Sequence, residues 1–244
     1  MNPQTARDAL IAQLHAQANP LRAAGEKQYL RSNLNFHGVP VPNIKAIIRT
    51  WLKSQPALNA DDLGALAGAL WASDWHEERS LAVFLLEERE KLLTPDHLPL
   101  IERMMREVNT WAHLDEIAIH VVGVLLERHP QIIREHLLRW ATDPNFWVRR
   151  VPVLAQNRQF RAGRGDAALF EQIAVPMLDE GAGWSKDERF FIRKAVGWAL
   201  REQCKHHPDW VVAFVNRHHA RMSGLTLREA TRRLPPDWAA KLAL

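Results

Sequence analysis

Hydrophobic side chains recur along almost the whole chain at the three- and four-residue spacing of amphipathic helices, and no sustained alternation of apolar and polar positions occurs. The predicted helices form two interleaved sets. The first set comprises residues 61–70, 95–107, 130–140, 167–178 and 208–219. The second set comprises residues 75–88, 111–127, 146–156, 189–203 and 226–234. The pattern therefore predicts an all-α fold built from helical pairs.

The helices of the first set begin 34, 35, 37 and 41 residues apart, which reveals an internal repeat. This period is shorter than the usual HEAT length and close to the tetratricopeptide length, but the tetratricopeptide signature is absent. Because each pair can bury its apolar face only against its neighbours, we expect an α-solenoid of HEAT-like helical pairs with a concave basic face. Residues 1–244 are interpreted as one repeat domain, with 1–52 as an N-terminal helical cap and an insertion loop around 162–187.

Local signals mark several helix boundaries. Residues of the capping type precede three helices of the second set, namely Asp74, Thr110 and Asp143. Prolines suited to the first turn begin three helices of the first set, namely Pro95, Pro130 and Pro208. Pro152 falls inside a predicted helix, where it should kink or break the chain.

Composition narrows the class of protein. Hydrophobic residues make up 47% of the chain, yet no uncharged apolar run approaches the roughly 20 residues that a spanning helix needs. The first ten residues, MNPQTARDAL, lack the layout of a secretory leader. A single cysteine, Cys204, excludes an internal disulfide framework and a cysteine-based zinc site. We therefore expect a cytoplasmic protein without a membrane anchor, a cofactor or a metal ion.

Basic residues are unevenly placed. Of the 32 Lys and Arg residues, 20 lie in residues 126–244, and residues 145–165 carry no acid at all. That segment contains five arginines, namely Arg149, Arg150, Arg158, Arg161 and Arg164. A localised basic stripe is typical of a nucleic-acid footprint, although a solvated helix face has the same composition.

Tryptophan recurs near the start of three helices of the second set. Trp111 has Asp115 one turn away, Trp147 has Arg150, and Trp198 has Lys194 and Arg201 on adjacent turns. Because these helices are equivalent members of one layer, we expect the side chains on a common surface. Each also has a simpler interpretation: a tryptophan at a helix start often packs, and Arg150 alone suits a surface ion pair. Asp115 is harder to explain, because a carboxylate among apolar residues is costly to bury unless it is paired or functional.

These residue types suit one chemistry. Arginine binds phosphate, and an aromatic face attracts cations and packs against sugars. A carboxylate stabilises a developing oxocarbenium ion and orients an attacking water. The combination points to hydrolysis of the N-glycosidic bond of a cationic base in DNA.

Five segments in order resemble the AlkD-type bacterial DNA alkylation-repair glycosylases. They are KQYLRSNLNFHGV (27–39), VNTWAHLDEIA (108–118), NFWVRRVPVLAQ (145–156), FFIRKAVGWALRE (190–202) and LTLREATRRL (225–234). The resemblance spans nearly the whole chain. It implies a HEAT-like solenoid that grips duplex DNA and excises N3- and N7-alkylated purines.

The resemblance also implies roles for individual residues. Asp115 matches the catalytic carboxylate, and Trp111 and Trp198 match aromatic residues that contact the sugar of the damaged nucleotide. Arg150 matches an arginine that supports catalysis and holds the DNA backbone, and Tyr29 matches an N-terminal aromatic residue near the lesion. The basic stripe, with Trp147 and Lys194, is assigned to DNA binding. We expect a monomer that acts on duplex DNA containing alkylated bases.

Three alternatives remain at this point. A HEAT-like module without catalytic activity would bind DNA or protein, and a relative specialised for bulky adducts, or one that binds damage without excision, would share the fold. The residues around 162–187 and Pro152 depart from the pattern of the family, which bears on substrate range more than on fold.

Overall fold

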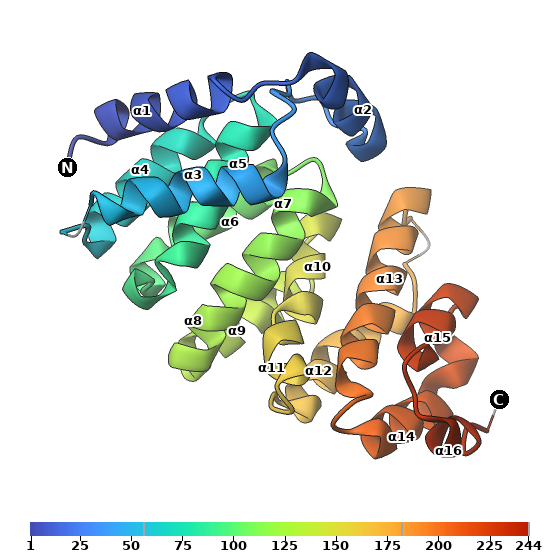
Figure 1. Cartoon of the computed structure of the whole chain (residues 1–244). Helices are drawn as coiled ribbons and strands as arrows, with labels where there is room; N and C mark the ends of the chain where they lie inside the picture. Colours follow the sequence, from blue (N-terminus) through green and yellow to red (C-terminus); the bar gives the residue numbers. More distant parts are fainter. Residues whose placement is uncertain (56, 182, 244) are drawn as a thin grey trace. The chain divides into compact units, whose positions relative to one another are not determined.

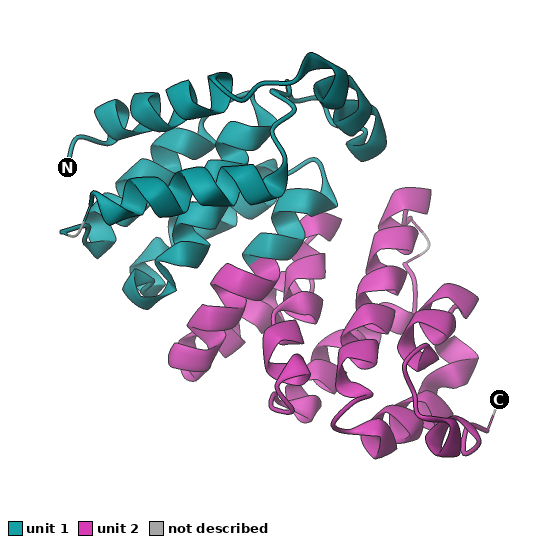
Figure 2. Cartoon of the chain, viewed as in Figure 1, with its two compact units in different colours: residues 1–117 teal, residues 118–244 magenta. Residues whose placement is uncertain are grey.

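The computed structural model of the chain describes residues 1–55, 57–181 and 183–243. Within these ranges it contains helices and no strand, apart from an isolated bridge between Asn35 and Trp75. The all-α prediction is therefore confirmed. The chain divides into two compact units, Met1–Ile117 and Ala118–Leu244 (Figure 2). The interpretation of residues 1–244 as a single domain stays a prediction.

Unit 1 is a stack of helices in which the successive helices from α3 to α7 alternate in direction along the chain (Figure 1). Helix α1 packs against α4, α3 packs against α5, and α5 packs against α7. Helix α2 differs from these, because none of its residues is buried. The helices are α1 (Pro3–His15), α2 (Pro20–Leu30), α3 (Val41–Lys53), α4 (Ala60–Trp71), α5 (His76–Glu88), the short η1 (Glu90–Leu92) and η2 (Pro95–His97), α6 (Leu98–Glu107) and α7 (Trp111–Glu116). Helices α1, α3 and α4 fill the core between them with leucine and isoleucine side chains.

Unit 2 is built around α13 (Lys186–Gln203), which packs against α10 and α15. Its remaining elements are the π-helix η3 (Ile117–Val122, beginning at the last residue of unit 1), α8 (Gly123–Arg128), α9 (Pro130–Trp140), α10 (Phe146–Leu154), α11 (Asn157–Arg161), α12 (Ala167–Ala174), η4 (Pro176–Leu178), α14 (Pro208–His218), η5 (His219–Arg221), α15 (Gly224–Thr231) and α16 (Pro236–Ala239). Among the described residues, no helix combines the length and apolar character that crossing a bilayer requires.

The predicted boundaries agree closely with most of these helices, and α9 matches its prediction at both ends. Thr110 caps α7 as expected. The predictions for Asp74 and Asp143 are wrong, because Trp75 and Asn145 occupy the N-cap positions of α5 and α10. Asp143 instead accepts a hydrogen bond from the backbone N–H of Asn145 at 2.9 Å, so it forms the turn that precedes the cap.

Two helices depart from the predicted pattern, whereas the stretch 162–187 agrees with the helix predicted over 167–178. The helix expected over 111–127 has a π-helical segment, Ile117–Val122, in its middle. Helix α10 accommodates Pro152 and ends two residues later, at Leu154. The stretch 162–187 contains α12 and η4 between loops, and its residue 182 lies outside the described residues. The positive φ angles of Gly163 and Gly165 explain why one of these loops requires glycine.

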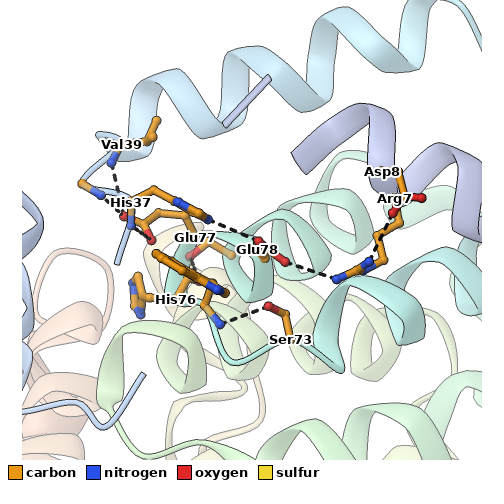
Figure 3. Close-up of polar contacts among 11 residues, drawn as sticks. Arg7, Asp8, His37, Val39, Ser73, His76, Glu77 and Glu78 are labelled. Carbon is orange, nitrogen blue, oxygen red and sulfur yellow. Dashed lines mark hydrogen bonds and ion pairs between the residues drawn. The ribbon is translucent and has the colours of Figure 1, made fainter. Parts of the chain in front are cut away.

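Buried polar groups connect the loop before α3 to α5 (Figure 3). The Glu77 carboxylate, 1% exposed, accepts backbone hydrogen bonds from His37 (2.9 Å), Gly38 (2.6 Å) and Val39 (3.2 Å). Its neighbour Glu78 lies between His37 Nε2 at 3.2 Å and Arg7 Nη2 at 3.5 Å. Because buried backbone donors need acceptors, these contacts fix the loop that joins α2 to the rest of unit 1.

Two further histidines lie stacked in the core of unit 1. The rings of His76 and His113 are 4.2 Å apart, and both side chains are buried. Burial, assisted by Arg79, lowers the pKa of His76 to about 4. Burial also lowers the pKa of His113 far below its usual range, and His76 adds to this effect. Both imidazoles are therefore neutral in the folded chain at pH 7.

We expect the free energy of unfolding to fall as the pH drops from about 6.5 towards 4. The unfolded chain binds protons at these histidines at a higher pH than the folded chain does, so stability is fully present above the unfolded pKa and is lost below it. Each histidine contributes a slope of about 1.4 kcal/mol per pH unit within its window. Urea unfolding of wild type and His113→Asn at pH 7.0, 5.5 and 4.5 measures this slope.

His207→Gln is the matched control, because His207 is exposed. This substitution leaves the buried pair intact, so the fall in stability from pH 7.0 to 4.5 should remain. A slope that is the same in wild type and His113→Asn would contradict the assignment of the acid sensitivity to this buried pair.

Candidate functional site

Helix α7 presents Trp111 and Asp115 on one face. The Thr110 hydroxyl accepts a hydrogen bond from Ala112 N, which fixes Trp111 as the first helical residue. Asp115 follows one turn later and is half-buried, whereas Trp111 is 36% exposed. The buried His113 lies on the opposite face of the helix, and the buried Leu114 lies between the two faces. Packing of the His113 face against α5 therefore directs the Trp111 and Asp115 face away from the core.

Tyr29 lies against Trp111. The two rings meet edge to face with centroids 6.1 Å apart, and Tyr29 is 73% exposed. A hydrogen bond of 3.1 Å from the Ser32 hydroxyl to Asn109 Oδ1 ties the end of α2 to the residues before α7. The structure thus brings two of the predicted site residues of unit 1 into contact and places the third, Asp115, one turn along the same helix.

In unit 2, Trp147 and Arg150 of α10 pack against α13. Asn145 caps α10 by accepting a hydrogen bond from Trp147 N at 2.9 Å. The Trp147 ring is half-buried and lies 4.7 Å from that of Phe191. Arg150 is 2% exposed, and its guanidinium donates to the Phe191 carbonyl and lies over the Phe191 ring. In the folded chain this guanidinium therefore holds α10 against α13.

Arg149 is similarly engaged by its own chain. Its guanidinium donates to the Asp143 carbonyl at 2.8 Å, forms an ion pair with Glu188, and lies over the Trp184 ring. Burial lowers the pKa of Arg149, while Asp143 opposes that shift. These contacts give Arg149 a part in fixing the start of α13.

The other basic candidates are more exposed. Lys194 is exposed above the Phe190 ring, and Arg158 is half-buried on α11. Arg164 is exposed and pairs with Glu127 at 3.0 Å. Arg161 is exposed and pairs with Glu202 at 2.8 Å. The pair of Arg164 with Glu127 lies at the surface, where such pairs are weak, so Arg164 can exchange this carboxylate for another anion at little cost.

Trp198 is half-buried on α13, and its position is fixed by two neighbours. The indole Nε1 donates to Glu202 Oε1 at 2.7 Å, and the Arg161 guanidinium lies over the ring at 5.8 Å from its centroid. The prediction treated Trp198 and Arg161 as separate DNA contacts and did not include Glu202. The spacing W-x-x-x-E over 198–202 repeats that of W-x-x-x-D over 111–115. The sequence therefore contained a signal that pairs Glu202 with Trp198.

One group of possible metal ligands occurs in unit 1. Ligand atoms of His15, His37 and Glu78 all lie within 4.8 Å of one another. However, His37 and Glu78 already hydrogen-bond to each other, and the Arg7 guanidinium beside Glu78 opposes the entry of a cation. The arrangement is that of a buried ion-pair network.

Comparison with known protein families shows to which family the chain belongs. A family model described as DNA alkylation repair enzyme matches residues 10–234. The chain belongs to the DNA alkylation repair enzyme family. The resemblance noted in the sequence is therefore confirmed, and with it a role in DNA alkylation repair.

Solved structures agree with this fold. A predicted DNA alkylation repair enzyme from Enterococcus faecalis is 22% identical, with a TM-score of 0.77 over 90% of this chain and 98% of that one. The protein smu.31 from Streptococcus mutans UA159 is 16% identical, with a TM-score of 0.57 over 80% of this chain and 93% of that one. No curated protein sequence matches this chain. At these identities the structural neighbours support the fold alone.

Proposed function

We propose that this member of the DNA alkylation repair enzyme family is a monofunctional DNA glycosylase that hydrolyses the N-glycosidic bond of N3- and N7-alkylated purines in duplex DNA. The observation that carries the proposal is the face of α7, where the Asp115 carboxylate lies one turn from an exposed tryptophan that Tyr29 also contacts. The family assignment supports alkylated DNA as the substrate.

The chemistry explains why one carboxylate suffices. Alkylation at N3 or N7 makes the purine cationic, so the base takes the bonding electron pair, leaves as a neutral molecule and needs no general acid. Positive charge then develops on the deoxyribose, where an anion and an aromatic face stabilise it. Water adds to C1′, and its proton passes to solvent. In this proposal Asp115 stabilises the cationic sugar and orients the water, and Trp111 forms an aromatic wall.

Unit 2 supplies DNA contacts in this proposal. Trp198 provides an aromatic contact with DNA. Four cationic side chains bind backbone phosphates, namely the half-buried Arg158 and the exposed Arg161, Arg164 and Lys194. Trp147, Arg149 and Arg150 keep α10 and α13 in position, since their side chains contact groups of α13 or of the segments that flank α10 and α13.

Release of free base from duplex DNA containing N7-methylguanine tests the proposal. We expect wild type to release the methylated base and to leave undamaged duplex DNA intact, without added metal or cofactor. Retention of all the methylated base by a chain that binds the duplex would contradict the proposal. That outcome would instead favour a HEAT-like module that binds damaged DNA without excision.

The same assay with a bulky N7 adduct addresses substrate range. Release of the bulky adduct alone would assign the chain to the specialised alternative.

A further inference from the structure

The side chain of Glu202 is the centre of an ion-pair network on α13. Its carboxylate is only 7% exposed and accepts hydrogen bonds from Trp198 Nε1 at 2.7 Å and from Arg161 Nε at 2.8 Å. Arg233 and Arg201 lie at 3.7 and 4.0 Å. These guanidinium groups supply the partners that a buried carboxylate requires, since an isolated buried anion would be costly.

This network restrains the indole of Trp198 in two ways. The hydrogen bond to Glu202 fixes the rotation of the ring in its own plane, and the Arg161 guanidinium lies over one face. A charge-assisted hydrogen bond from Nε1–H also raises the electron density of the indole, which strengthens its attraction for a cation.

Pairing of a tryptophan with a glutamate and an arginine also occurs elsewhere in the chain. In unit 2, Trp210 Nε1 donates to Glu171 at 3.1 Å, and Arg217 donates to the same carboxylate oxygen at 2.6 Å. Neither Trp210 nor Glu171 belongs to the proposed site. The Trp210 pair is therefore a matched comparison that has the same chemistry without the proposed catalytic role.

We propose that Glu202 is a positioning residue, which with Arg161 holds the Trp198 indole in one orientation for contact with a deoxyribose of the DNA substrate. This proposal rests on the proposed glycosylase function. It assigns a function to a carboxylate that touches neither substrate nor reacting atoms. It also gives Arg161 a second role besides phosphate binding, because the same guanidinium closes one face of the indole.

Single-turnover release of N7-methylguanine from duplex DNA tests the positioning role. Glu202→Gln should lower the rate constant by about tenfold, the order expected for losing a hydrogen bond to a charged group. Duplex affinity should change far less, because Gln leaves the phosphate contacts in place. Arg161→Ala, at an exposed residue that leaves the core intact, should slow release as well. Glu171→Gln, the matched control, should release base at the wild-type rate.

A double-mutant cycle with Trp198→Phe separates positioning from general stabilisation. Because Phe has no indole N–H, Glu202→Gln should cause no further loss of rate in that background. The Trp198 indole N–H resonance, identified by its disappearance in Trp198→Phe, should move upfield in Glu202→Gln. This measurement is independent of activity and also shows that the variant is folded.

The outcomes distinguish this proposal from the function on which it rests. Wild-type release of base together with full activity of Glu202→Gln would overturn the positioning role alone. An equal loss of rate from Glu202→Gln in the wild-type and Trp198→Phe backgrounds would also overturn it. A wild-type chain that releases no base would overturn the proposed function, and the positioning role of Glu202 with it.

Discussion

Asp115→Asn should release alkylated base from duplex DNA about 10²–10³-fold more slowly than wild type, the range expected for loss of one electrostatic group in a transition state. Asparagine preserves the size of the side chain on α7 but removes its negative charge. The affinity for duplex DNA should change in the opposite direction, because removing an anion from a DNA-binding surface reduces the repulsion between that surface and the phosphates. We therefore expect duplex affinity to be equal or higher while the single-turnover rate falls.

Glu116→Gln is the control for this experiment. It removes the same charge one residue further along α7, at a position rotated by about 100° around the helix. A loss of rate caused by the overall electrostatic field of the protein would affect both variants equally. The proposed mechanism instead predicts a large loss of rate in Asp115→Asn alone. Asp115→Asn with the wild-type rate would refute the mechanism even if the chain proved to be a glycosylase.

The sequence was sufficient for most of the fold because helix periodicity repeats in every pair. Local sequence signals indicated some helix boundaries and not others. The capping box formed by Ser185 and Glu188 begins α13 three residues before the predicted start, and this signal was present in the sequence. The π-helix at Ile117–Val122 had no comparable signal, because one short segment cannot show whether its hydrophobic period is 3.6 or longer.

The candidate site was predictable only where it depends on neighbours along one helix. The shared face of Trp111 and Asp115 follows from their i,i+4 spacing. The contact of Tyr29 with Trp111 joins two helices that are far apart in sequence, and only the resemblance indicated it. The burial of Arg150 was not foreseen because arginine is usually exposed, and its acceptor is a backbone carbonyl on another helix, which leaves no trace in side-chain spacing.

Glu77→Ala should destabilise unit 1 by roughly 3–5 kcal/mol, although Glu77 belongs to no candidate site. Its carboxylate accepts three backbone hydrogen bonds from residues 37–39, and leaving a buried donor unsatisfied costs about 1–3 kcal/mol. The Gly38 backbone has φ +77, and a Cβ there would lie 2.1 Å from the Asn19 carbonyl, so this loop has little freedom to find another arrangement. Hydrogen exchange at residues 37–39 and urea unfolding measure the loss.

Glu88→Ala on the same helix provides the comparison. Glu88 pairs with Arg49 at 2.7 Å near the surface, and such pairs contribute about 0–1 kcal/mol. Equal stability of the two variants would show that the amide contacts of Glu77 contribute little. If the predicted difference is found, base release by Glu77→Ala should also fall, because the loop it anchors carries α2 and thereby sets the position of Tyr29 beside Trp111. The buried carboxylate of α5 would then contribute to the geometry of an exposed site that it does not touch.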